Sequence, residues 1–230
     1  GYYIWRSGWG ESERYEDERF LVFDCGPLGD GNHGHLDLLS FELYGFGRPL
    51  IVDPGRYTYA ENSSPNWRVL FRGTSYHNTV TVDGKHQARY EERKGKHKIR
   101  GPHAAFELTG LGQGMFRGRV VSPEYDAIHE REIRVLNSRN FLIVDQLSGV
   151  TSHQYDLWFH LSPSAQGCVA TRGAAVTAPG IRMEQLAPAA LSIEDGWISP
   201  TYGIKHPAPI VRYTAVGTHT RFETHIEVLA

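Results

Sequence analysis

The sequence is poor in the features that would assign it to a specialised class of protein. Cysteine occurs only at Cys25 and Cys168 among 230 residues, which excludes a disulfide-rich scaffold and a four-cysteine zinc site. We expect both cysteines to be buried free thiols. No apolar run approaches the ~18 residues of a membrane span. The net charge of −2 gives no general attraction for nucleic acid or an anionic membrane, so we expect neither as a partner.

Helical periodicity is scarce, and there is no initiator methionine. The chain opens on GYYIWR, which already reads as a strand. The hydrophobic content of 40% is that of an ordinary folded domain. We therefore expect residues 1–230 to form a single domain that belongs to a longer protein.

Short alternating or apolar segments, separated by turn residues, predict an all-β fold, a multi-stranded antiparallel β-sandwich. The last segment shows this best, because Phe222, Thr224, Ile226 and Val228 alternate with polar residues. The other predicted strands cover residues 19–25, 38–44, 49–53, 79–82, 133–136, 141–144 and 155–161. A seam near residues 149–153 is expected between two halves of the sandwich.

Two further segments predict structures other than the strands of the sandwich. Residues 66–72 (NWRVLFR), which follow Pro65, predict one or two helical turns. The mixed charge run over residues 85–100 predicts a solvated loop or an exposed hairpin. Seven of the twelve histidines stand singly in polar surroundings and are expected at the surface: His86, His97, His103, His129, His206, His219 and His225.

Three segments carry candidate site residues. His33 and His35 stand two positions apart after a glycine-rich approach, and on an extended segment they would face the same side. They could share a metal, or one could be a ligand while the other faces a substrate. Asp53 ends an apolar strand, where its partner could be a cation or its own Pro-Gly turn. His77 begins the next strand, and spacing alone leaves open whether the three segments converge.

The ordered motifs HGH, VDPG and HNT resemble the C-terminal β-domain of the heparinase II/III-like polysaccharide lyases. They lie in GNHGHLDLLSFELYGFGRPLIVDPGRYTY and WRVLFRGTSYHNTVTVDG, and a looser likeness continues through WFHLSP and GWISPTYGIKHPAP. Members of that family have an N-terminal helical (α/α) toroid before the sandwich and bind substrate between the two. The resemblance implies that this chain is the sandwich alone, with the toroid as its partner in the parent chain.

The resemblance also implies roles for individual residues. His35, Asp53 and His77 match the ligands of a structural Zn²⁺, and His33 matches a catalytic residue of the cleft. Neighbours expected to orient these groups or the substrate are Asn32, Arg72 and Asn78.

The resemblance further implies a lyase that cleaves a uronic-acid-containing, acidic polysaccharide by β-elimination. Because other catalytic residues would come from the toroid, the isolated chain is expected to have little activity. A bacterial source and a periplasmic or secreted location are suspected on the same ground.

Two other functions remain open from the sequence. A non-catalytic carbohydrate-binding or structural module could use Trp67, Trp158 or Trp197 for stacking on sugar rings. A zinc-dependent hydrolase would need a general base, for which Asp37 or Glu42 could serve. A cupin-like metal site fits the VDPG and HNT motifs less well.

Overall fold

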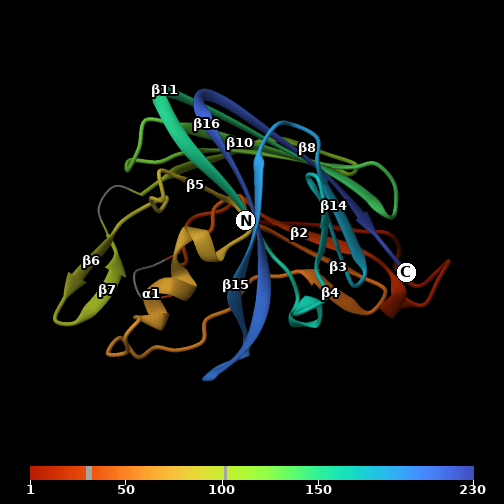
Figure 1. Cartoon of the computed structure of the whole chain (residues 1–230), viewed down its shortest axis with the longest axis horizontal. Helices are drawn as coiled ribbons and strands as arrows, with labels where there is room; N and C mark the ends of the chain where they lie inside the picture. The colour runs from red at the N-terminus through yellow and green to blue at the C-terminus, as the bar shows by residue number, and fades with distance from the viewer. Residues whose placement is uncertain (30–32, 101–102) are drawn as a thin grey trace.

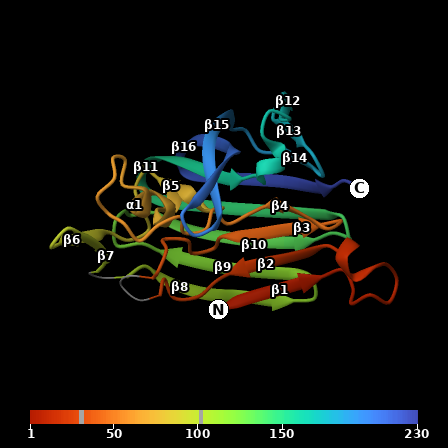
Figure 2. The same cartoon turned by 90° about the horizontal axis from the view of Figure 1, so that it is seen from below.

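Apolar residues at alternate strand positions bury one face of each of two antiparallel sheets, and these faces pack on each other. The computed structural model describes residues 1–29, 33–100 and 103–230. The larger sheet arches over the smaller one in Figure 1, and Figure 2 shows their strands running in nearly the same direction. The predicted antiparallel β-sandwich is confirmed.

The smaller sheet has the strand order β1–β2–β3–β4, and its neighbours are antiparallel. Its strands are β1 (Tyr2–Arg6), β2 (Phe20–Asp24), β3 (Phe41–Gly45) and β4 (Arg48–Ile51). Phe46 and Gly47 turn from β3 into β4 with positive φ angles, as a tight hairpin requires. The strand predicted over residues 38–44 begins only at Phe41, because Leu39 takes a positive φ and ends the extended run before it.

The larger sheet has the order β12–β13–β14–β16–β11–β10–β9–β8, with β15 paired to β16 and β5 paired to β11. Its strands are β5 (Val80–Val82), β8 (Ala105–Gly112), β9 (Met115–Val121), β10 (Ile128–Val135), β11 (Asn140–His160), β12 (Ala170–Arg172), β13 (Ala175–Ala178), β14 (Ile181–Gln185), β15 (Ala190–Thr201) and β16 (Ile204–Val228). The predicted hairpin between β10 and β11 is confirmed.

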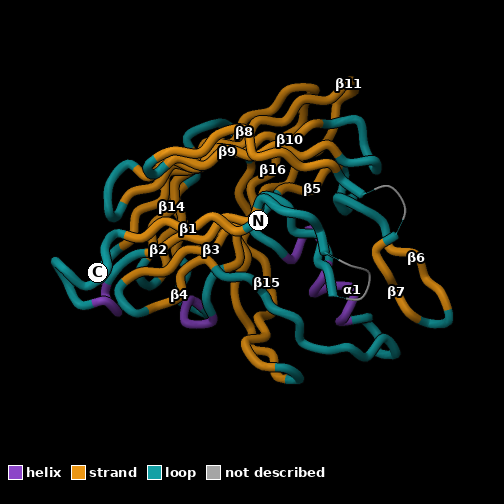
Figure 3. Tube along the Cα trace, turned by 180° about the vertical axis from the view of Figure 1, so that it is seen from behind, coloured by secondary structure: helices purple, strands orange, loops and turns teal. Residues whose placement is uncertain are grey.

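The hairpin of β6 (Tyr90–Arg93) and β7 (Lys96–Ile99) and the helix α1 (Trp67–Arg72) lie at one side of the sandwich, as Figures 1 and 3 show. The short 3₁₀ helices are η1 (Tyr15–Asp17), η2 (Thr74–Tyr76) and η3 (Pro163–Ala165). Asn66 caps α1, since its side chain accepts from the Val69 N–H, so the predicted helical turns are confirmed. No helix in the described part of the chain is long and apolar enough to cross a membrane.

Three expectations from the sequence are wrong. The predicted seam at residues 149–153 is crossed by β11, and the turn residues there mark only a register shift in its pairing with β16. Cys168 is exposed, so only Cys25 is the buried free thiol that was expected. His129 is buried, because it packs against Asp145 inside the larger sheet.

A buried ionic network joins the larger sheet to the loops beneath it. Arg131 of β10 and Asp145 of β11 are both fully buried and are linked by two hydrogen bonds, of 2.7 and 3.1 Å. The Arg131 Nη1 also donates to the carbonyl oxygens of Leu39 and Asn78, at 2.6 and 2.5 Å. This one guanidinium therefore fixes the backbone of two segments that lie beside the candidate site.

A second charged cluster joins β11 to the connections that follow β5 and β9. His153 of β11 contacts Asp83 through Nδ1 at 2.7 Å and Asp126 through Nε2. The hydrogen bond to Asp83 is the main cause of a raised His153 pKa, and the contacts with His153 lower the pKa of both carboxyl groups. The folded state therefore favours the imidazolium between two carboxylates.

We expect a His153→Gln variant to lose more thermal stability near about pH 5.5 than near about pH 8.5, relative to the wild type. A raised histidine pKa gives stabilisation that is complete below the ordinary pKa of about 6.5 and is lost as the pH rises through the raised value. The lowered carboxyl pKa values set the acid limit, since their contribution is lost as the pH falls through them. Melting temperatures across this range check the prediction, and a difference that does not change with pH would contradict it.

Candidate catalytic and metal site

The loop between β2 and β3 carries His33 and His35. His33 lies in a turn, and Gly34 and His35 belong to no strand, so the two histidines do not stand on a β-strand. Arg72, at the end of α1, shapes this loop, because its Nε donates to the Gly34 carbonyl oxygen at 2.9 Å. A side chain at Gly34 would clash with the Leu28 carbonyl oxygen, so glycine is required between the two histidines.

Asp53 and His77 meet the same loop from two other directions. Asp53 follows β4 and His77 follows η2, and the Asp53 Oδ2 lies 2.7 Å from the His77 Nδ1. The other Asp53 carboxylate oxygen accepts from the Gly55 N–H at 2.8 Å. The rings of His35 and His77 lie 5.1 Å apart between centroids. Three segments that are distant in the sequence thus converge on one place.

Asp37 joins these residues, although the sequence analysis considered it only as the base of a hydrolase. One potential ligand atom each from His35, Asp37 and His77 lies within 4.8 Å of the other two. Ligand atoms around a tetrahedral zinc stand about 3.3 Å apart, so small side-chain shifts would close this set on an ion. The buried His77 Nε2 has no hydrogen-bond partner among the described residues. The residues present therefore fit a zinc ion.

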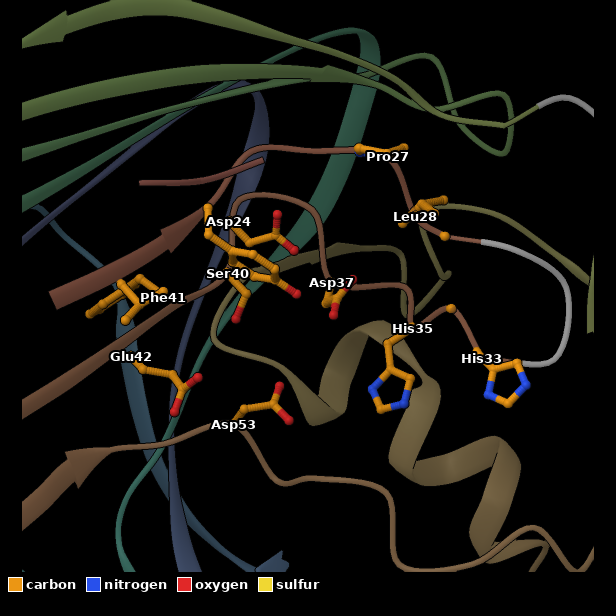
Figure 4. Close-up of a pocket in the computed structure, with 14 residues that line it drawn as sticks. Asp24, Pro27, Leu28, His33, His35, Asp37, Ser40, Phe41, Glu42 and Asp53 are labelled. Atoms are coloured by element: carbon orange, nitrogen blue, oxygen red, sulfur yellow. The ribbon is translucent and has the colours of Figure 1, made fainter. Parts of the chain in front are cut away.

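Acidic side chains surround the cavity beside this cluster. The cavity has a volume of about 440 Å³, and Figure 4 shows its side chains directed towards one another from β2, β3 and the loops that follow β2 and β4. The carboxylates that line it are Asp24, Asp37, Glu42 and Asp53. Such a concentration of negative charge favours a cation over an anionic sugar at this point.

Burial and neighbouring charges shift the pKa values around the cavity. Burial, and then the charge of Asp37, raise the pKa of Asp24 to about 7. Burial, and then the charge of His77, lower the pKa of His35 to about 3, which leaves a neutral imidazole able to bind a metal. Burial alone would raise the pKa of Asp53, but the charge and hydrogen bond of His77 outweigh it and hold that pKa at about 2.

His33 has a different environment from His35. Its side chain is exposed, and it lines both the acidic cavity and a second cavity of about 630 Å³. The Tyr59 hydroxyl lies 3.4 Å from the His33 Nδ1, and Arg56 Nη2 donates to the His33 carbonyl oxygen at 2.9 Å. The Arg56 guanidinium lies over the Tyr59 ring, 4.2 Å from its centroid. No motif in the sequence marked Tyr59 as a site residue.

Two of the three residues expected to orient the site, Arg72 and Asn78, form hydrogen bonds with the segments that carry it. Arg72 holds the loop, as described above. Asn78 follows His77 and donates to the carbonyl oxygens of Phe41 and Val52, at 2.8 and 2.9 Å, which ties His77 to β3 and to the segment after β4. Asn32 lies outside the described residues.

The fold and the site define an antiparallel β-sandwich domain that carries a histidine and carboxylate cluster beside an open, partly basic cavity. Residues 1–228 match the family model described as Heparinase II/III-like, C-terminal. The chain belongs to this family of β-sandwich domains, as its motifs led us to expect.

Curated relatives and solved structures agree with this assignment. Heparin-sulfate lyases of Bacteroides stercoris and Bacteroides thetaiotaomicron are 26% and 28% identical to it over 166 and 171 residues. Each match covers 70% of this chain and 22% of the relative, so the chain spans about a fifth of those proteins.

Two solved structures show the same fold over nearly the whole chain. A heparinase III gene product superposes with a TM-score of 0.80 at 23% identity, over 100% of this chain and 35% of the other. A mutant heparan sulfate lyase from Pedobacter heparinus gives a TM-score of 0.78 at 20% identity, over 99% and 35% of the two chains.

Proposed function

We propose that this chain is the β-domain of a lyase that cleaves a uronic-acid-containing polysaccharide by β-elimination. The observation that carries the proposal is the position of His33, an exposed histidine at the junction of two cavities with its ring against Tyr59. The curated relatives named as heparin-sulfate lyases support the class of reaction and the class of substrate.

The reaction sets three tasks. A proton must leave C5 beside the carboxylate, the growing negative charge on that carboxylate must be neutralised, and the leaving glycosidic oxygen must be protonated. His33 acts at the C5 and carboxylate end, because an imidazole near neutral pH can accept a proton or offset a charge. Tyr59 orients the His33 ring, and Arg56 holds the His33 backbone beneath the cavity.

A zinc ion would be held by His35, Asp37 and His77, whose potential ligand atoms lie together, while Asp53, the carboxylate that the motifs suggested, would hold His77 in place through its Nδ1. When bound, the ion offsets the negative charge of the acidic cavity and fastens three loops together. Its part is structural, since His33 lies on the open side of the loop and His35 faces His77. The position of His33 then depends on how firmly the loop is held.

The remaining catalytic groups would come from outside this chain, in the helical toroid that precedes such sandwiches in the family. We expect the full-length lyase to release unsaturated uronate products from heparan sulfate, and the 230-residue chain alone to release little or none. Ultraviolet absorbance of the unsaturated product measures this directly. Saturated products would identify a hydrolase, and strong activity of the 230-residue chain alone would contradict the divided site.

A further inference from the structure

The β6–β7 hairpin has two faces of opposite character. Its cross-strand partners are Glu91 with Lys98, Glu92 with His97, and Arg93 with Lys96. One face packs inward, where Ile99 belongs to the core and His97 is half-buried. The other face, with the turn, presents what we call the basic face, formed by Arg93, Lys94, Lys96, Lys98 and Arg100.

The charge of the basic face is not offset within the described residues. The ion pairs of this region are those of Arg89 with Glu124, of His97 with Glu61 and of Arg68 with Glu61, and none of them involves the basic face. Glu91 is the one carboxylate that shares its side of the hairpin, as the cross-strand partner of Lys98. Five cations set against one carboxylate produce a strong local positive potential on a chain whose net charge is −2.

The basic face continues directly from the cavity that holds His33. The cavity of about 630 Å³ is lined by His33 and Tyr59, by the ion pair of Glu61 with Arg68, and by Lys94 and Lys96. A third cavity, of about 310 Å³, is lined by the basic face alone and shares the same two lysines. The two cavities therefore form one path that leads from His33 outwards along the hairpin.

The hairpin is fastened to the His33 loop. The Arg72 guanidinium donates to the Gly34 carbonyl oxygen at 2.9 Å and to the His97 carbonyl oxygen at 3.0 Å. Glu61 accepts from the His97 N–H at 2.8 Å and pairs with Arg68 at 2.5 Å. The same interactions that position the catalytic loop thus hold the basic face in a fixed relation to it.

We propose that the basic face is a second binding surface for the anionic polysaccharide. It would bind the part of the polysaccharide that runs outwards from His33, and this proposal rests on the function proposed above. Alternate residues of a strand lie about 6.6 Å apart, so Lys96, Lys98 and Arg100 repeat at a spacing shorter than a disaccharide. The ligand it fits is a chain with more than one carboxylate or sulfate in each disaccharide. Its part is to hold the substrate and not to react with it.

Titration calorimetry with a heparan sulfate octasaccharide tests this on the 230-residue chain. A variant carrying Arg93→Gln, Lys96→Gln and Lys98→Gln is expected to bind about tenfold more weakly, since each exposed charge contributes up to about 1 kcal/mol. The slope of log affinity against log salt concentration should fall by about two, because fewer counterions are displaced. A hyaluronan octasaccharide, with one carboxylate in each disaccharide, should bind the wild type at least about tenfold more weakly.

A matched control separates this surface from a general effect of charge. Arg48→Gln, Arg172→Gln and Arg182→Gln together remove the same charge from the side of the molecule where β4, β12 and β14 lie, away from the hairpin (Figure 2), and should leave the affinity unchanged. Glu91→Gln removes the one opposing carboxylate and should tighten binding about two- to threefold.

The outcomes decide the two proposals separately. Equal affinity of the hairpin variant and the wild type, equal losses in the hairpin and control variants, or equal binding of the two octasaccharides would each overturn the binding surface. A full-length protein that releases no unsaturated product would overturn the proposed function, and the binding surface would still stand on the affinity data.

Discussion

On the function proposed above, a His33→Ala variant of the full-length protein should keep one zinc ion per chain and lose about 10²- to 10⁴-fold in turnover, the range typical for removal of a positioned acid or base. The ring of His33 faces the open cavity and Tyr59, whereas the metal-type cluster is built from His35, Asp37 and His77. The two functions should therefore separate. Metal content by elemental mass spectrometry and the rate of unsaturated product formation measure them independently.

The reciprocal variant, His77→Ala, supplies the control for this result. It removes a fully buried imidazole that contacts Asp53 and lies beside His35, so the zinc should be lost together with most of the activity. Loss of zinc from His33→Ala would make His33 a ligand instead of a catalytic residue. A well-folded wild type that takes up no zinc would remove the metal site and leave the fold assignment intact.

An Asp145→Ala variant should lose about 3–5 kcal/mol of unfolding free energy, because it leaves a buried guanidinium without its counter-charge. Arg131 is fully buried, and besides Asp145 its described hydrogen-bond partners are the carbonyl oxygens of Leu39 and Asn78. Those carbonyls lie in the segments that carry the site residues, so the octasaccharide affinity should also fall. Urea unfolding with linear extrapolation measures the stability.

A surface ion pair provides the comparison for this variant. Arg221 and Glu223 are 2.8 Å apart on β16, and their side chains are 47% and 29% exposed. Glu223→Ala should therefore change the unfolding free energy by less than about 1 kcal/mol. Similar losses in the two variants would show that the buried network contributes no more than a surface pair.

Local patterns in the sequence predicted much of the fold. Alternation over residues 221–228 reappears in β16, where Phe222, Thr224, Ile226 and Val228 are buried. Asp83-Gly84 forms a turn directly after β5, and Asn137–Asn140 joins β10 to β11. Both were predicted because Asn, Asp, Ser and Gly favour turn geometry through local interactions. The prediction of a seam near residues 149–153 was wrong, because the same residue types occur at a seam and at a register shift within one long strand.

The site was predicted only in part. His33, His35, Asp53 and His77 were singled out through their motifs, and all four lie where the loops converge. Asp37 stands two positions after His35, so the spacing that linked the two histidines could also have marked it. Tyr59 had no such signal, because it reaches His33 only after the turn at Gly55 and the docking of α1 fold its segment back.

The charge run over residues 85–100 shows the limit most clearly. Its composition predicted a solvated loop or an exposed hairpin, and residues 90–99 form a hairpin, β6–β7. Composition could not show that Arg72 fastens this hairpin to the loop of His33, or that its cations line the same cavity.

The all-β class, the family and most residues of the candidate site could be read from the sequence, because strand periodicity, turn chemistry and motif order are local properties of the chain. The tertiary structure decided which distant side chains meet. Burial and pairing depend on contacts across the two sheets, so only the folded chain buries Arg131 and His129 around Asp145, brings Asp37 to His35 and His77, and separates an acidic metal-type cavity from a basic path on either side of His33.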